Sequence, residues 1–242
     1  MQIADRTEER AFEPDSLYDA PSYRPREAAR ILSIPVSTVK AYCFGQGYRT
    51  RAGDAKTFAA VIMPADREQK LLSFANLCEL HVLRAITKRH SIPLQQVRSA
   101  LQYLRVELKV ERPLLDQEFM TNGINLFLEY SGQLLNISLR GQAALRGQLE
   151  AALTRIERGS SGRPIRLFPF SRPASTAEQP RIVAIDPRIG FGRPVVLPAR
   201  VRTEVIIDRF EAGDSPDEMA ADYGVTQADI LEAVRFEYRL AA

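Results

Sequence analysis

Short polar and cationic side chains recur between residues 37 and 56, at spacings suited to contact a nucleic acid. Hydroxyl, phenol and ammonium groups on one helix can contact base edges and phosphates when that helix lies in the major groove of DNA. The arginines and lysine that follow can contact phosphates or a minor groove. We therefore predict a DNA-binding site made of Ser37, Thr38, Lys40, Tyr42, Arg49, Arg51 and Lys56.

We expect a helix-turn-helix over residues 23–42 to position the first four of these side chains. Pro25 suits the first turn of a helix, where its missing N–H would be unpaired in any case. Ala29 is small, so a second helix can cross close to the first. Ser33 ends the first helix, and Ile34 fills the core beneath the turn. This order of small and apolar residues is typical of the motif.

The second helix of this motif follows Pro35, which prevents the first helix from simply continuing. Ser37 or Thr38 can cap or open it, and Val39 returns to the core one turn later. The side chains on its exposed face are then short or cationic, as a helix in the major groove requires. The alternative is a small helical hairpin with no nucleic-acid partner.

A hairpin is expected directly after this motif. Two short extended pieces flank Ala52-Gly53-Asp54, and a hairpin in this place is the wing of a winged helix-turn-helix. Between residues 23 and 56 seven arginines and lysines outnumber two carboxylates, which gives a net charge of +5. Such a local excess of positive charge is expected for a phosphate-bearing partner. The alternative is a solvated loop with scattered cations.

The composition is that of an ordinary globular protein, with 45% apolar and 26% charged residues among 242. Its two cysteines, Cys43 and Cys78, support neither a disulfide framework nor a zinc site. The histidines, His81 and His90, have no ligand partners at metal-binding spacing. No apolar run approaches ~20 residues, and the polar start lacks the features of a signal peptide. We therefore expect a reduced cytoplasmic protein without a metal, a cofactor or a membrane segment.

The middle of the chain is expected to combine helices with a short hairpin. Residues 66–109 have the dense apolar pattern of two helices that break at residues 90–93. Residues 124–138 predict a β-hairpin that turns at Ser131-Gly132. A further helix is expected over residues 141–158. Its apolar face consists of Ala144, Leu145, Leu149, Leu153 and Ile156.

These expectations divide a mainly α protein with small β-hairpins, of the α+β class, into five parts. They are a flexible lead at 1–20, a winged helix-turn-helix at 21–64, a central helical and hairpin region at 65–170, a linker at 171–180 and a C-terminal homeodomain-like helix-turn-helix domain at 181–242. The linker is rich in proline, serine, threonine and alanine. The apolar helices of the central region are the expected dimer interface.

The C-terminal part repeats the pattern of the first helix-turn-helix. Ser215-Pro216-Asp217-Glu218 is a capping box with proline at the first helical position. The register of the N-terminal motif recurs at Ala220, Gly224, Val225 and Ile230. Residues 204–242 carry ten carboxylates and three arginines, a net charge of −7, which would repel phosphates. We therefore expect this unit to contact protein rather than to read DNA alone.

Two segments of the C-terminal part carry a family resemblance: IDPRIGFGRPVV at residues 185–196 and GDSPDEMAADYGV at residues 213–225. They resemble a widespread bacterial and archaeal domain of unknown function that is assigned to antitoxins of type II toxin–antitoxin pairs. Over about residues 20–240 the chain looks like the larger VapB-type antitoxins, which carry an N-terminal winged DNA-binding domain. The N-terminal motif is also similar to MerR-type regulators.

The resemblance implies two roles and two partners. The N-terminal domain would bind double-stranded operator DNA and repress its own operon, as a homodimer because operators are usually palindromic. Another part would hold a PIN-like ribonuclease toxin inactive. A PIN site is a cluster of carboxylates around a divalent metal, which an inserted arginine could displace. The candidates for that contact are Arg193, Arg200 and Arg202.

Two other functions are weighed against this one. A MerR-like transcriptional regulator without a toxin would share the helix-turn-helix and the wing. Regulators of that kind usually end in a long antiparallel coiled coil and an effector pocket, whereas this chain continues into a second helix-turn-helix. An enzyme is not expected, because the sequence has no P-loop, no GxSxG, no HExxH and no acid–histidine–nucleophile set.

Overall fold

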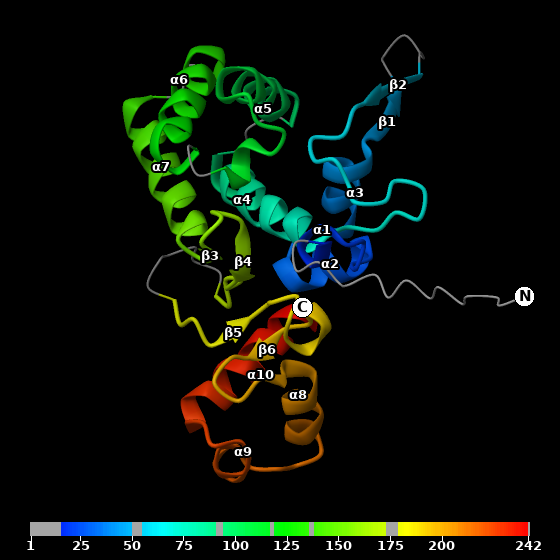
Figure 1. Cartoon of the computed structure of the whole chain (residues 1–242), viewed down its shortest axis with the longest axis vertical. Helices are drawn as coiled ribbons and strands as arrows, with labels where there is room; N and C mark the ends of the chain where they lie inside the picture. The colour runs from blue at the N-terminus through cyan, green and yellow to red at the C-terminus, as the bar shows by residue number, and fades with distance from the viewer. Residues whose placement is uncertain are drawn as a thin grey trace, which may run out of the picture.

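The computed structural model describes residues 16–49, 55–90, 94–116, 119–135, 138–172 and 179–241. These residues are mostly helical, with three small antiparallel sheets, which confirms the predicted α+β class (Figure 1). In this view the central helices and the N-terminal helix-turn-helix lie side by side above the C-terminal unit. Within the described ranges no helix is long and apolar enough to cross a membrane.

The N-terminal part contains the predicted helix-turn-helix, followed by two paired strands. Its elements are α1 (Ser16–Asp19), α2 (Pro25–Leu32), α3 (Val36–Phe44), β1 (Gln46–Arg49) and β2 (Ala55–Phe58). Ser33 ends α2 in a left-handed conformation, with a φ of 47°. The two strands pair antiparallel, and Gln46 lies opposite Phe58. The expected turn between them, residues 50–54, lies outside the described residues.

Part of the expected flexible lead is a packed helix. The ring of Tyr18 in α1 lies 5.9 Å from the ring of Phe74, centroid to centroid. Tyr18 is buried in the main core together with Phe74. Residues 1–15 lie outside the described part of the chain.

The second helix of the motif begins one residue earlier than predicted. α3 starts at Val36, and Pro35 is its N-cap residue. The prediction that Ser37 or Thr38 caps this helix is therefore wrong. The physical reason is that proline has its φ fixed near the helical value, which is −58° here, so it can start the helix without a side-chain cap.

The central region is built around α4, which is buried along most of its length and packs against α1, α2 and α7. The elements of this region are α4 (Phe74–His90), α5 (Leu94–Leu108), η1 (Pro113–Leu115), the π-helical turn η2 (Phe119–Gly123), α6 (Ile124–Leu135) and α7 (Leu139–Leu153). α4 ends at His90 and α5 begins at Leu94, and residues 91–93 of the predicted break lie outside the described residues. The first of these two helices starts at Phe74 rather than near residue 66, because Asp66 and Leu71 close a turn with an antiparallel bridge.

Residues 124–135 form helix α6, so the predicted β-hairpin over residues 124–138 is wrong. Ile124, Phe127 and Leu128 are buried at spacings of three and four, which is the period of a helix. Ser131 and Gly132 lie within α6 instead of forming a turn. A Cβ at Gly132 would meet the side-chain amide of Gln142 in α7, so the two helices pack closely at this point.

The helix after α6 ends earlier than predicted. α7 stops at Leu153, and Ile156 lies in strand β3 (Ile156–Arg158) instead of on the helix face. β3 pairs with β4 (Pro164–Leu167), and Ile156 lies opposite Leu167. Residues 159–162 are therefore the turn of a hairpin. The residue directly before β3 explains this outcome, because its side chain is held by distant backbone groups.

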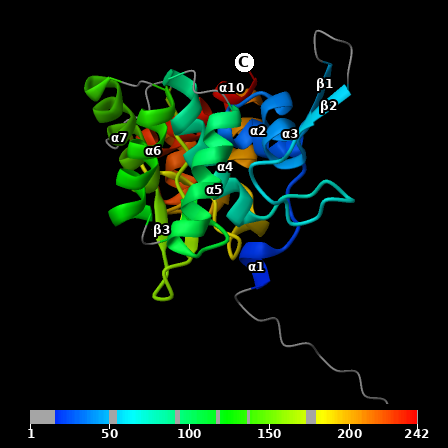
Figure 2. The same ribbon diagram turned by 90° about the horizontal axis from the view of Figure 1, so that it is seen from above.

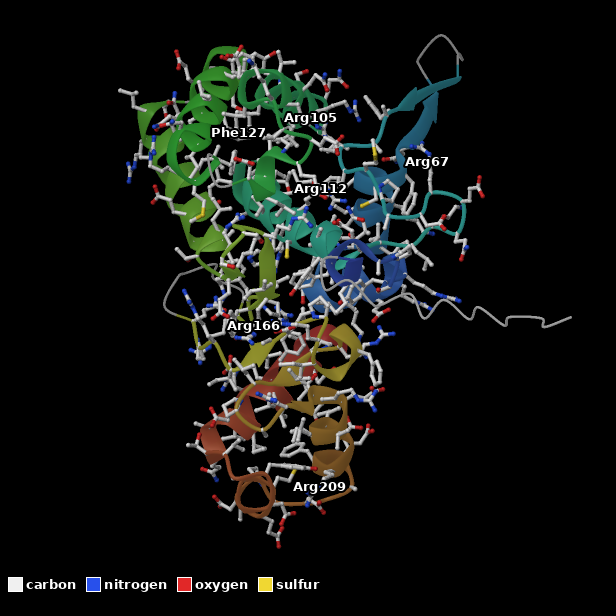
Figure 3. All side chains as sticks on the ribbon, viewed as in Figure 1. Arg67, Arg105, Arg112, Phe127, Arg166 and Arg209 are labelled. Carbon is white, nitrogen blue, oxygen red and sulfur yellow. The ribbon has the colours of Figure 1, made fainter. Side chains whose placement is uncertain are left out.

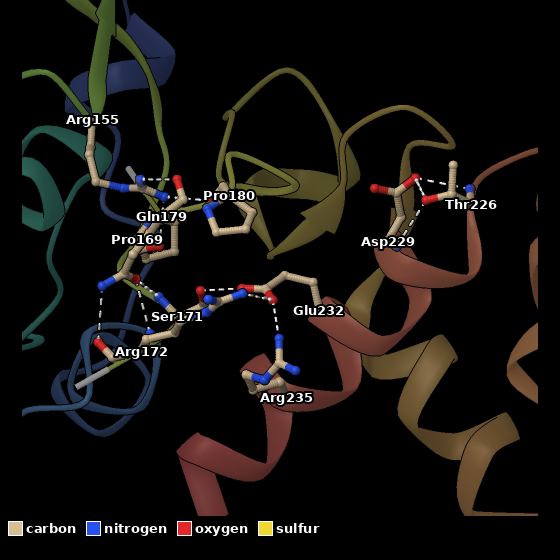
Figure 4. Close-up of polar contacts among 10 residues, drawn as sticks. All are labelled: Arg155, Pro169, Ser171, Arg172, Gln179, Pro180, Thr226, Asp229, Glu232 and Arg235. Atoms are coloured by element: carbon tan, nitrogen blue, oxygen red, sulfur yellow. Dashed lines mark hydrogen bonds and ion pairs between the residues drawn. The ribbon is translucent and has the colours of Figure 1, made fainter. Parts of the chain in front are cut away.

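That residue is Arg155, whose guanidinium is fully buried (Figure 4). It donates hydrogen bonds of 2.7 to 2.8 Å to the carbonyl oxygens of Phe168, Gln179 and Pro180. Buried carbonyl groups need such donors, since an unpaired one costs about 1–3 kcal/mol. Arg155 thus ties the end of the central region to the start of the C-terminal unit.

Both ends of the expected linker are packed rather than free. Ser171 and Arg172 donate to the carboxylate of Glu232 in the C-terminal unit, and Gln179 accepts from the backbone amide of Ser171 at 3.0 Å (Figure 4). Glu232 is also paired with Arg235. Residues 173–178 lie outside the described residues.

The C-terminal unit combines a three-stranded sheet with the predicted second helix-turn-helix. Its elements are β5 (Val183–Ala184), η3 (Gly190–Gly192), β6 (Val195–Val196), β7 (Val201–Arg202), α8 (Thr203–Glu211), α9 (Pro216–Tyr223) and α10 (Gln227–Ala241). The predicted capping box is confirmed, because the side chains of Ser215 and Glu218 each accept from the other's backbone amide. Gly224 ends α9 with a φ of 63°. This unit has a small apolar core of its own.

Candidate nucleic-acid interface

Two of the predicted DNA-contacting side chains on α3 are exposed. Ser37 and Lys40 lie at the surface, and Thr38 is half-buried. Ser37 and Lys40 are three residues apart, so they share one face of the helix. A hydroxyl and an ammonium group in this position can donate hydrogen bonds to phosphate oxygens or base edges.

Tyr42 is only 7% exposed, so the prediction that it lies on the exposed face of this helix is wrong. It belongs to the main core together with Val39 and Cys43. Residues three and four apart share a helix face, so the apolar face that Val39 begins continues through Tyr42 and Cys43. Burial raises the pKa of the Tyr42 hydroxyl.

The hairpin of β1 and β2 projects from the body of the molecule beyond α3 (Figures 1 and 2). Arg49 and Lys56 lie in its two strands, whereas Arg51 lies outside the described residues. The base of the hairpin is fixed to α3, because the amides of residues 61 and 62 donate to the carbonyl of Tyr42 at 2.7 and 3.0 Å. The hairpin therefore follows directly from the C-terminal end of α3.

The three arginines predicted for toxin contact do not form one cluster. Arg193 and Arg202 lie beside α2 of the N-terminal motif, where Arg193 forms an ion pair with Glu27. Arg200 is exposed in the turn between β6 and β7, in a left-handed conformation with a φ of 56°. The first two are therefore neighbours of the helix-turn-helix, and only Arg200 stands apart from it.

Direct hydrogen bonds dock the C-terminal unit on α2 and on Tyr23, which lies two residues before this helix. The buried Tyr23 hydroxyl donates to the carbonyl of Gly192 at 2.9 Å, and burial raises the pKa of this phenol. Arg239 near the end of α10 donates to the carbonyl of Ile31 at 3.0 Å. The paired residues are 169 and 208 positions apart in the sequence. No local sequence pattern could have indicated that these segments meet.

Two buried ionisable side chains of α4 are explained by the core. His81 Nε2 donates to the carbonyl of Ala152 at 3.2 Å, and burial lowers the pKa of this imidazole to about 3. Glu79 accepts from the amide of Asn76 at 3.0 Å and lies 3.7 Å from Arg112, which is labelled beside α4 in Figure 3. Burial raises the pKa of this carboxyl group. Among the described residues no group of three metal-ligating side chains occurs.

Two family models match parts of the chain. Residues 21–101 match a family described as a "Putative DNA-binding HTH domain", and residues 183–236 match a "Protein of unknown function (DUF433)". The first match covers α2, α3, the hairpin and α4, and the second covers most of the C-terminal unit.

Proteins of Mycobacterium tuberculosis are similar over nearly the whole chain. "Putative antitoxin VapB45" of strain ATCC 25618 / H37Rv is 27% identical over 239 residues, which cover 90% of this chain and 94% of that protein. "Uncharacterized protein Rv2308" of the same strain is 23% identical over 235 residues, with coverages of 93% and 94%. The crystal structure of Rv2018 from this organism has the same fold, with a TM-score of 0.65 at 22% identity, over 90% of this chain and 99% of that one. The chain therefore resembles an antitoxin along its length, and its N-terminal helix-turn-helix resembles those that bind DNA.

Proposed function

We propose that the protein is an antitoxin of a type II toxin–antitoxin pair that binds operator DNA as an autorepressor. Its second role in this proposal is to neutralise a PIN-like ribonuclease toxin. It acts in the cytoplasm, without a cofactor or catalytic activity of its own.

The N-terminal helix-turn-helix is the observation that carries the proposal. It matches a family of DNA-binding type, and Ser37 and Lys40 stand exposed on its second helix. The surrounding residues 23–56 have a net charge of +5, which favours phosphate as the partner. The similarity to a putative antitoxin over 90% of the chain supports the antitoxin role.

Binding to the DNA upstream of the protein's own gene tests the first role. We expect the full chain to bind a labelled upstream fragment more tightly than a scrambled fragment, with an affinity that falls steeply as KCl rises. The double variant Arg49→Ala/Arg51→Ala is expected to lose most of this affinity. The matched control Lys109→Gln/Arg140→Gln removes two exposed cations outside the predicted site and is expected to bind like the wild type. Equal binding of the upstream and scrambled fragments by the wild type would refute the autorepressor role.

An exposed aromatic side chain supports the proposed toxin contact. Phe191 is 93% exposed and has a left-handed backbone with a φ of 57°, between two glycines that also have positive φ. A side chain on Gly192 would collide with the Tyr23 hydroxyl, so this turn is held in place by close contact. A large aromatic ring presented by a fixed turn is the kind of residue that anchors protein interfaces. We assign Phe191 to the toxin contact, with Arg200 as the exposed arginine of the same unit.

Co-purification tests this second role. The chain is co-expressed with a small protein encoded beside it, and the complex is captured through a tag on that partner. We expect Phe191→Ala to reduce the captured amount at least tenfold. Met63→Ala removes another apolar side chain, 80% exposed, and is expected to leave capture unchanged. If no neighbouring protein is captured by the wild type while DNA binding persists, the protein is a transcriptional regulator without a toxin.

The proposal includes a homodimer built on the central helices. Val106 on α5 and Leu139 at the start of α7 are exposed apolar side chains on this region. Sedimentation of the wild type is expected to give a dimer, and Val106→Glu or Leu139→Glu is expected to give a monomer. A wild-type monomer that still binds a palindromic operator would contradict this assembly.

A further inference from the structure

A groove of about 510 Å³ separates α2 from the C-terminal unit. We call it the α2 groove, and we define it by the five arginines that line it from both sides. They are Arg24, Arg26, Arg30, Arg193 and Arg202. The first three belong to α2 or to its N-cap position, and the other two to the C-terminal unit.

The arginines of the α2 groove outnumber its carboxylates. Glu27, Glu204 and Glu237 line the same space. They pair with one arginine each: Glu27 with Arg193, Glu237 with Arg30 at 3.5 Å, and Glu204 with Arg202 at 3.8 Å. The last two pairs are long and involve exposed arginines, so they stabilise the protein little.

Two of the five arginines have no acidic partner. Arg24 and Arg26 are exposed, and neither forms an ion pair within the described part of the chain. Packing does not explain them either, since both lie at the surface at the start of α2. The N-terminal end of a helix adds partial positive charge there, so this end of the groove favours an anion.

The groove continues to the turn of the helix-turn-helix. A second hollow of about 550 Å³ shares Arg26 and Arg30 with it and extends past Ser33 and Pro35 to the start of α3. Arg239 lines this hollow, and its Nε and Nη1 atoms are buried without a hydrogen-bond partner among the described residues. A continuous path of cationic side chains therefore leads from the C-terminal unit to the helix that carries Ser37 and Lys40.

A sugar–phosphate backbone fits this path better than an acidic protein does. In helix-turn-helix proteins the first helix crosses the DNA backbone while the second lies in the major groove. Arginine forks match phosphate oxygens, and the path ends where the second helix of the motif begins. An acidic protein would need no such alignment with the helix-turn-helix.

We propose that the α2 groove binds phosphates of the operator, so that Arg193 and Arg202 of the C-terminal unit form part of the DNA-binding surface. This inference rests on the proposed operator binding and extends it to a part of the chain whose net charge is negative. It also separates Arg193 and Arg202 from Arg200, which remains assigned to the toxin.

Arg202→Gln in the full chain is the decisive variant. Its side chain is about half exposed, and its ion-pair partner is another exposed side chain, so the fold does not depend on it. Binding to the upstream DNA fragment is measured by fluorescence anisotropy over a KCl series. The slope of log affinity against log salt falls by about 0.9 for each phosphate contact that is lost. We expect this loss for Arg202→Gln, about twice this loss for Arg24→Gln/Arg26→Gln, and none for the control Arg140→Gln on α7.

The outcomes distinguish this inference from the proposed function. A reduced slope for Arg202→Gln with an unchanged melting temperature supports the α2 groove as a phosphate site. If Arg202→Gln and Arg140→Gln bind alike while Arg49→Ala/Arg51→Ala loses DNA, the groove inference is overturned and operator binding stands. The inference is equally overturned if Arg202→Gln keeps the wild-type slope but no longer captures the co-expressed toxin. If the wild type binds no upstream DNA, the proposed operator binding fails and the groove inference fails with it.

Discussion

The two helix-turn-helices share one backbone plan and differ in what surrounds it. In both, the first helix begins with proline and ends at a left-handed residue, which is Ser33 in the N-terminal motif and Gly224 in the C-terminal one. The N-terminal motif is part of the main core, whereas the C-terminal motif packs around a small core of its own. Residues 23–56 carry a net charge of +5, and residues 204–242 carry −7.

The comparison teaches that the backbone of the motif does not decide its partner. Both motifs could present a second helix to a groove of DNA, but only one presents it with an excess of positive charge. The exposed position of Lys40 in α3 is taken by Leu231 in α10, when the two motifs are aligned on their left-handed residues. Under the proposed function, the side chains on this shared backbone would therefore decide which partner each motif binds.

Acid is expected to destabilise the main core, on which the N-terminal motif depends, because the core contains the buried imidazole of His81. The pKa of buried His81 is lowered to about 3, while an unfolded chain has a histidine pKa near 6.5, so the unfolded chain binds more protons between these values. The free energy of unfolding that depends on neutral His81 is fully present above about pH 6.5. It is lost as the pH falls toward 3, by up to about 1.4 kcal/mol per pH unit. We expect urea unfolding to show this loss in the wild type. His81→Gln, which keeps a donor for the carbonyl of Ala152, should show a flatter pH dependence.

Hydrogen exchange locates this loss within the molecule. At about pH 4.5 the amides of α4 are expected to lose protection before those of α9, because α9 belongs to the separate small core. Earlier loss in α9 than in α4 would mean that the two motifs do not depend on different cores.

Charge reversal at matched positions sharpens the comparison of partners. Lys40→Glu on α3 removes an ammonium group that could donate to phosphate oxygens and adds a charge that repels them. We therefore expect operator affinity to fall about 30-fold, roughly 2 kcal/mol. Leu231→Glu on α10 adds a carboxylate at the matching place, which is 39% exposed, and is expected to change affinity less than about twofold. Fluorescence anisotropy with the upstream fragment measures both. Similar losses in the two variants would mean that both motifs contact DNA.

The first helices of the two motifs, α2 and α9, differ in side-chain capping, and removing the cap of α9 tests what it contributes. Ser215 caps α9 through its side chain, whereas α2 has no side-chain cap. Ser215→Ala is expected to lower the free energy of unfolding by about 1 kcal/mol. Ser160→Ala, at an exposed site in the turn between β3 and β4, is the control and should change it by less than about 0.5 kcal/mol in the same urea titration. An effect of Ser215→Ala no larger than that of the control would mean that the cap does not stabilise α9.

The smallest expected effect concerns the left-handed residues between the helices. Ser33 has a φ of 47° and a buried hydroxyl without a hydrogen-bond partner in the described structure, whereas its counterpart is Gly224. Ser33→Gly relieves both costs and loses some of this gain to the greater freedom of the unfolded chain, so we expect about 0.5 kcal/mol of added stability. Gly224→Ala should cost about 1 kcal/mol. A destabilised Ser33→Gly would show that the serine is better accommodated than its conformation indicates.

The parts of the fold that follow from local patterns could be predicted from the sequence. Both helix-turn-helices combine a proline start, a small residue such as Ala29 or Ala220, and a turn residue that adopts a positive φ. These signals lie within about 20 residues of one another, so a single sequence contains them. Local pattern is misleading at α6, where Ser131 and Gly132 resemble a turn but lie in a helix that packs against α7.

The candidate site was predictable only in part, because it depends on contacts between distant segments. The place of Lys40 in the motif predicts its exposure, whereas the burial of Tyr42 is not predictable, because the sequence does not show how far around α3 the core-facing side extends. The approach of Arg193 to Glu27 requires the docking of the C-terminal unit on α2. Long-range docking of this kind leaves no periodic pattern in the sequence.

The hydrogen bond from Tyr23 to Gly192 has a practical consequence for anyone who divides this chain. A fragment that stops before the C-terminal unit would leave the phenol and the Ile31 carbonyl facing water without their partners. The two fragments would then expose complementary hydrogen-bonding surfaces, and we expect them to associate when they are mixed.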